Sequence, residues 1–159
     1  MKSRSIVAGI LLILMLCVLP QPVAAYSTNS SLLSITHADY CDLDGDGFAD
    51  DVLTKVIVGT HSGLPEFVFC WTTLKLTLPS GTESYTDVWI WGIYSSVEIT
   101  VEWYDHATES GWYSLHVTMD SMTMLDSFAA EAHMVFDPPD EGPPGTPWVR
   151  VMLSSPSCM

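Results

Sequence analysis

The stretch V-E-I-T-V-E-W-Y, at residues 97–104, alternates apolar and polar side chains with a period of two. Successive side chains of a β-strand point to opposite faces of a sheet, so this period is typical of a strand with one buried face. Residues 113–119 alternate in the same way, and the link between the two segments contains a Ser-Gly turn signal. We expect these two strands to form a hairpin.

Six further segments have strand character, and turn residues separate most of them. They are residues 32–37, 52–58, 67–78, 88–94, 130–136 and 148–153. Only residues 122–129 are compatible with a helical turn. About eight short strands without a repeat predict one all-β domain, an antiparallel β-sandwich with Greek-key connections. Residues 137–147 contain five prolines, which predicts an extended Pro/Gly-rich surface loop.

The N-terminus has the layout of a secretory signal peptide. Lys2 and Arg4 precede an uncharged apolar run at residues 6–19, and the small residues 23–25 follow. The run is shorter than the roughly 20 residues that span a bilayer, and no second long apolar run follows. We therefore expect a signal peptide at residues 1–25 and a secreted or cell-surface domain at residues 26–159, without a membrane span; a retained membrane anchor is the alternative.

The charge balance is strongly acidic, with five Lys and Arg against nineteen Asp and Glu and a net charge of -14. Without residues 1–25, three bases face all nineteen acids, which gives -16. Nucleic-acid binding needs clustered Lys and Arg, so this class of function is excluded. Attraction to an anionic membrane surface is disfavoured for the same reason. Metal cations are the natural counterions.

The string D-L-D-G-D-G-F-A-D at residues 42–50 has the spacing of a calcium loop. Carboxylates at positions 1, 3 and 5 converge on a hard cation when the chain curls, and a glycine at position 6 permits the sharp turn. Oxygen ligands alone suit calcium better than a transition metal. The expected ligands are Asp42, Asp44, Asp46 and Asp50, with the carbonyl of Phe48. The alternative is an Asp/Gly-rich surface turn.

This string resembles the calcium loops of EF-hands, dockerins, thrombospondin type 3 repeats and integrin-type repeats. A full EF-hand has a bidentate Glu at its twelfth position, where this chain has Leu53. The flanking segments also read as strands rather than paired helices. The integrin-type variety therefore fits best, and it implies that Asp42, Asp44, Asp46 and Asp50 ligate calcium between two strands.

A broader resemblance covers most of residues 26–159. An N-terminal aspartate loop, a central W-Y-D-H-A-T-E-S-G-W-Y segment and a closing F-D-P-P look like secreted single-domain proteins of archaea. That group has no established function, so the resemblance implies export and an all-β domain but no activity.

Three cysteines follow the signal segment, and an exported protein meets an oxidising compartment. We favour a disulfide between Cys41 and Cys70, because both would flank the first hairpin. Pairing of Cys158 with either of them, an intermolecular bridge and three unpaired thiols are the alternatives. Asn29-Ser30-Ser31 is a glycosylation acceptor sequence.

Alternation at residues 87–94 places Trp89 and Trp91 on one face of a strand and apolar residues on the other. We favour an interpretation in which both faces are covered, because large exposed apolar patches are uncommon. If the indoles are exposed instead, they offer flat rings on which sugars stack, as in modules that resemble carbohydrate-binding modules.

Signatures of common enzyme classes are absent, and the five histidines are scattered singly. A catalytic role for Asp105, His106 and Glu109 lacks a partner, while His116 and His133 are placed to face each other on two strands. We therefore expect a non-enzymatic, secreted, calcium-binding surface or interaction module with a structural metal. A carbohydrate-binding module, or a filament or adhesin subunit that forms homo-oligomers through sheet edges, is the alternative.

Overall fold

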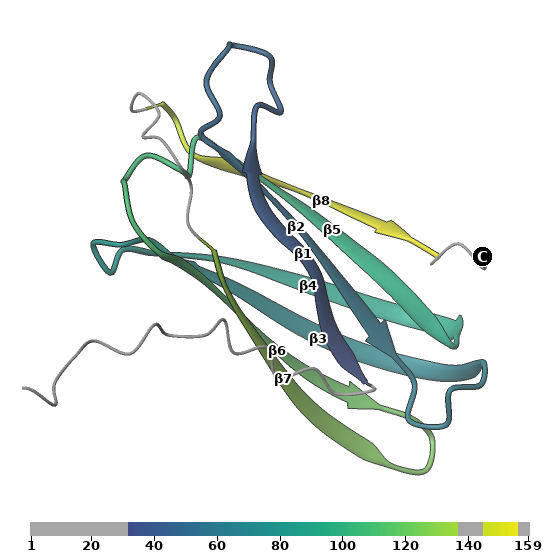
Figure 1. Ribbon diagram of the computed structural model, residues 1–159. Coiled ribbons are helices and arrows are strands. Elements are labelled where there is room, and N and C mark those ends of the chain that lie inside the picture. Colours follow the sequence, from purple (N-terminus) through teal and green to yellow (C-terminus); the bar gives the residue numbers. More distant parts are fainter. Residues whose placement is uncertain (1–31, 137–144, 156–159) are drawn as a thin grey trace, which may run out of the picture.

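The structure is a computed structural model that describes residues 32–136 and 145–155 (Figure 1). The predicted signal peptide, Asn29, Cys158 and most of the Pro/Gly-rich loop lie outside the described residues. The described part is all-β and contains no helix that is long and apolar enough to cross a membrane. Its eight strands are β1 (Leu33–Cys41), β2 (Asp51–Gly59), β3 (Glu66–Thr77), β4 (Glu83–Tyr94), β5 (Ser96–Tyr104), β6 (Tyr113–Met122), β7 (Ser127–Phe136) and β8 (Trp148–Ser154).

The strands form two antiparallel four-stranded sheets, with orders β1-β2-β5-β8 and β4-β3-β6-β7. Figure 1 shows the two sheets packed face to face, and β1 at one edge contacts β7 of the other sheet. The predicted β-sandwich is therefore confirmed. The neighbours β2–β5 and β3–β6 are far apart in the chain, which is the kind of pairing that a Greek-key sandwich contains.

The expected hairpin between residues 97–104 and 113–119 is wrong. β5 pairs with β2 and β8, and β6 pairs with β3 and β7 in the other sheet. Both edges of β5 are occupied, so the chain crosses the sandwich after Asp105, whose φ of 56° turns the backbone. Residues 122–129 contain no helical turn: they comprise the end of β6, a hairpin turn at residues 123–126 and the start of β7. A hydrogen bond from Thr123 N to Asp126 O at 2.8 Å closes the turn.

The core lies between the sheets and consists of the inward side chains of alternate strand positions. Its largest fully buried members are Trp103 and Tyr113. The Trp103 indole N–H donates to Thr54 Oγ1 at 3.1 Å, so this buried polar group is satisfied. The core fixes the ends of β2 and β5, which carry the acidic site described below.

The expected disulfide between Cys41 and Cys70 is wrong, since both are free cysteines. Cys41 ends β1 in one sheet, whereas Cys70 lies inside β3 in the other sheet, with its sulfur 3.4 Å from Thr72 Oγ1. The prediction assumed one hairpin between them, but the chain changes sheet between β2 and β3.

Candidate functional site

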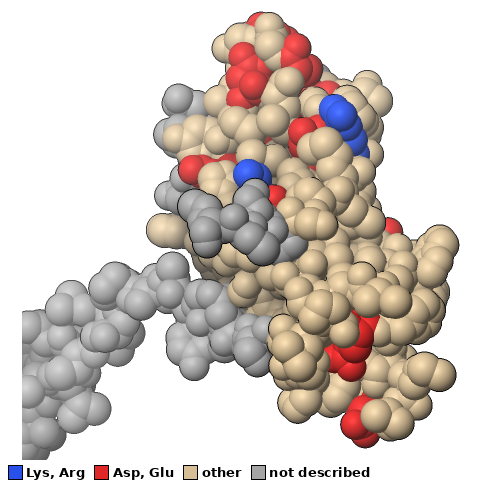
Figure 2. All heavy atoms as spheres, turned by 90° about the vertical axis from the view of Figure 1, so that its right-hand side faces the viewer, with Lys and Arg blue, Asp and Glu red and all other residues tan. Residues whose placement is uncertain are grey.

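The aspartate loop connects β1 to β2 and projects from one end of the sandwich (Figure 1). Figure 2 shows Asp and Glu atoms gathered at this end of the molecule. The nearby Cys41 thiol lies in the same negative environment. Its burial, followed by the charges of Asp51 and Asp39, raises its pKa to about 11.

The loop curls as its spacing predicts. Asp42 accepts hydrogen bonds from Gly45 N at 2.7 Å and from Gly47 N at 3.1 Å, through different oxygens. Asp44 accepts from Asp46 N at 3.1 Å, and Asp46 accepts from Phe48 N at 2.8 Å. Gly45 and Gly47 have φ angles of 79° and 95°, which a residue with a side chain rarely adopts. Backbone amides of the loop thus orient the carboxylates of Asp42, Asp44 and Asp46.

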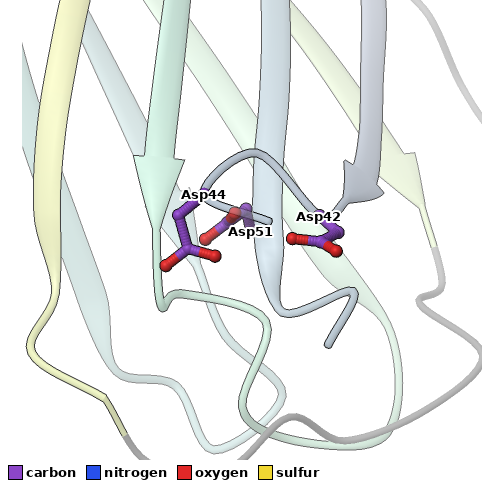
Figure 3. A group of neighbouring side chains, drawn as sticks. All are labelled: Asp42, Asp44 and Asp51. Atoms are coloured by element: carbon purple, nitrogen blue, oxygen red, sulfur yellow. The ribbon is translucent and has the colours of Figure 1, made fainter. Parts of the chain in front are cut away.

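Three carboxylates meet at the base of the loop: Asp42, Asp44 and Asp51 (Figure 3). Each offers one oxygen within 4.8 Å of the other two. This group contains two of the predicted ligands, whereas Asp46 and Asp50 lie outside it. Asp51 was not among the predicted ligands, because the loop motif ends at position 9, which is Asp50. The two adjacent aspartates, Asp50 and Asp51, at the start of a strand could have indicated it.

Asp51 is fully buried and connects three segments of the chain. One of its oxygens accepts from Leu43 N at 2.6 Å, in the loop, and the other accepts from Asp105 N at 2.9 Å, just after β5. Charged acceptors make stronger hydrogen bonds than neutral ones. Asp51 therefore fixes the base of the loop to the ends of β2 and β5.

Asp50 is only 1% exposed, and its Oδ2 has no hydrogen-bond partner. It belongs to a second acidic group with Asp51 and Asp105, whose ligand oxygens also lie within 4.8 Å of one another. Burial raises the pKa of Asp50, and the neighbouring charges of Asp46, Asp51 and Asp105 act in the same direction. Asp50 is thus grouped with Asp51 and Asp105, and Asp51 links this group to Asp42 and Asp44 of the loop.

The other polar residues singled out from the sequence are held in hydrogen bonds or ring contacts. His106 is buried, with Nδ1 2.7 Å from Tyr104 O, and burial lowers its pKa. Glu109 accepts hydrogen bonds from the amide and hydroxyl of Ser80, both at 2.8 Å. His116 and His133 do face each other, with ring centroids 6.3 Å apart, but neither belongs to a metal-ligand group in the described part of the chain.

The second feature is an apolar strip on the outer face of β3 and β4. Trp89 and Trp91 are 51% and 71% exposed, so the favoured interpretation, in which this face is covered, is wrong. The strip comprises three cross-strand pairs: Phe67 with Ile93, Phe69 with Trp91, and Trp71 with Trp89. The alternation correctly predicted that both indoles lie on one face of the strand. It carries no information on whether another layer covers that face, and in the described residues none does.

Within the strip, Trp71 and Trp89 stack with centroids 4.9 Å apart and planes 10° apart, and Phe69 lies tilted against Trp89 at 5.6 Å. The Trp71 indole N–H donates to Asp87 Oδ1 at 3.3 Å. An open groove of about 440 Å³ adjoins these rings, lined by Phe69 and Trp71 on one side, Asp120 and Met122 on β6, and Phe128 on β7. The groove combines aromatic rings with the exposed carboxylate of Asp120, a composition that is common in binding sites.

Comparison with known protein families, curated proteins and solved structures finds no match to this chain.

Proposed function

We propose that this chain is an exported, calcium-binding β-sandwich that acts outside the cell as a surface or interaction module, with calcium in a structural role. The central ligands of the loop site are Asp42, Asp44 and Asp51. Asp46 and the carbonyl of Phe48, in the same loop, are the further ligands that the spacing suggests. Export rests on the signal sequence at residues 1–25.

The observation that carries the calcium proposal is the convergence of Asp42, Asp44 and Asp51 at the base of a loop whose amides already orient the first two. Three carboxylate oxygens within 4.8 Å fit one ion, because calcium binds oxygen at about 2.3–2.6 Å, and two oxygens on one ion are then at most about 5 Å apart. A cation there would offset the mutual repulsion of the three charges and hold the loop to β2.

The test is a calcium titration of residues 26–159 by calorimetry, together with thermal melts in calcium and in chelator. With a dissociation constant of about 0.1 mM, 10 mM calcium stabilises the fold by about 2.7 kcal/mol, which raises the melting temperature by roughly 10 °C. We expect Asp44→Asn to weaken loop binding at least tenfold. Asp126→Asn, in the exposed turn before β7, is the matched control and should bind as wild type. Unchanged binding in Asp44→Asn would contradict the assignment.

The apolar strip supports a second candidate function, binding of a neutral glycan. Two exposed aromatic residues, Phe69 and Trp71, line the groove, and their cross-strand partners Trp91 and Trp89 are also exposed. Sugar rings pack their C–H faces on such side chains. Asp120 offers a carboxylate to sugar hydroxyls at the groove wall. The strongly negative net charge disfavours acidic polysaccharides, so the ligand expected here is uncharged.

Binding to an array of neutral glycans, followed by titration of the best ligand, tests this candidate. We expect Trp71→Ala to weaken binding at least tenfold, because it removes a ring from the groove wall. Tyr85→Ala, an exposed aromatic substitution on β4 opposite Lys75 and outside the groove, should leave affinity unchanged. Equal affinity of wild type and Trp71→Ala for every glycan bound would reject the strip as a sugar site.

A further inference from the structure

The acidic group behind the loop differs from the loop group in being buried. Asp50 and Asp51 are 1% and 0% exposed, and only Asp105 reaches the surface in part. The three residues come from two places in the chain. Asp50 and Asp51 lie at the start of β2, and Asp105 directly follows β5. A hydrogen bond of 2.6 Å from Ala107 N to Asp50 O holds the two segments together.

A third segment lies against one member of this group, Asp105. The backbone of Gly145, shortly before β8, lies so close to the Asp105 carboxylate that a Cβ at this position would overlap it. A larger residue at position 145 would therefore displace Asp105 from its place beside Asp50 and Asp51.

These carboxylates need a compensating positive charge. Burial of an ionised carboxylate is costly unless the charge is paired, and here three lie within reach of one ion. None of the ion pairs in the described residues includes Asp50, Asp51 or Asp105. Backbone amides satisfy both oxygens of Asp51, but Asp50 Oδ2 is buried without any donor. A buried carboxylate that has one oxygen without a donor and lies beside two other carboxylates is suited to binding a cation.

We propose that Asp50, Asp51 and Asp105 hold a second divalent cation of the calcium type, at a buried site separate from the loop group. Oxygen-only ligands favour a hard ion, and oxygens within 4.8 Å of one another can all reach one calcium ion, whose bonds to oxygen are about 2.3–2.6 Å long. Asp51 takes part in both groups, so the two ions share one carboxylate. The second ion joins the start of β2 to the link after β5.

The experiment is a calorimetric calcium titration of residues 26–159 in four forms: wild type, Asp50→Asn, Asp105→Asn and Asp44→Asn. We expect wild type to bind two ions, and the Asp50 and Asp105 variants to bind one. Asp44→Asn should weaken only the loop site, at least tenfold. Asn keeps the size of Asp and removes the repulsion, so in chelator the Asp50 and Asp105 variants should melt at or above the wild-type temperature.

The outcomes separate this proposal from the loop site. A single ion that is lost in Asp44→Asn but kept in Asp50→Asn and Asp105→Asn would overturn the second site and leave Asp50 as a protonated, neutral acid. A single ion that is kept in Asp44→Asn but lost in Asp50→Asn and Asp105→Asn would reject the loop site and support the buried one. Gly145→Ala provides a variant that alters no carboxylate; it should weaken the buried site at least tenfold and leave the loop site unchanged.

Discussion

Replacement of Trp103 by Ala is expected to lower the free energy of unfolding by about 3–5 kcal/mol, the range typical of a buried Trp. Trp103 is fully buried between the sheets, and its indole N–H donates to Thr54 Oγ1. The Thr54 hydroxyl in turn donates to Val101 O at 3.3 Å. The substitution therefore leaves a large cavity and takes the donor away from a buried hydroxyl of β2.

Urea unfolding followed by circular dichroism measures this loss. Trp103→Phe keeps a ring in the core but removes the N–H, so its cost should be well below that of Ala. Trp91→Ala is the control for loss of a Trp on the surface, and it should change stability by no more than about 0.5 kcal/mol. Similar effects for Trp103→Ala and Trp91→Ala would show that Trp103 does not anchor the core.

Trp103 also connects the core to the acidic site. Its ring meets His106 edge-on, with centroids 5.6 Å apart, and Asp105 lies between them in the chain. We therefore expect a cavity at Trp103 to loosen the segment that carries Asp105. The end of β5 therefore serves both the apolar core, through Trp103, and the acidic site, through Asp105.

The sequence predicts the strands better than their partners. Alternation at residues 97–104 depends only on one buried face, so it identified β5 without reference to any other strand. Pairing is decided by which edges are free after the whole chain folds. That information is absent from the link at residues 105–112, and the expected β5–β6 hairpin failed for this reason. The prediction of a Cys41–Cys70 disulfide was wrong for the same reason, because it assumed that segments close in sequence pair with each other.

The candidate site shows the same division between local and long-range information. The curl of the loop depends on Asp42, Gly45 and Gly47, which are close in sequence, so local spacing is enough to indicate a tight turn there. Asp105 approaches Asp50 only because β2 and β5 are neighbours in one sheet. No spacing rule within residues 42–50 could have revealed that approach.

Substitution of Asp51 by Ala is expected to produce the largest loss of stability among the acidic residues: about 3–6 kcal/mol from its two hydrogen bonds, and more in saturating calcium, where ion binding is lost as well. Two backbone amides, Leu43 N and Asp105 N, lose a charged acceptor, and hydrogen bonds to charged groups contribute about 1.5–3 kcal/mol each. In chelator the loss should be smaller, because removing the Asp51 charge also relieves its repulsion with the carboxylates of both groups.

Urea unfolding in calcium and in chelator measures both effects. Asp51→Asn retains one acceptor oxygen and should fall between wild type and Asp51→Ala. Asp39→Ala is the matched control, because Asp39 is exposed and, within the described residues, accepts a hydrogen bond only from the adjacent Tyr40 N, at 2.9 Å. Its cost should stay within about 0.5 kcal/mol. If Asp51→Ala costs the same in calcium and in chelator, Asp51 fixes the loop through its hydrogen bonds alone and is not a metal ligand. A cost that grows with calcium would make this one buried carboxylate both the structural anchor of the loop and a ligand, since binding to the folded state adds directly to its stability.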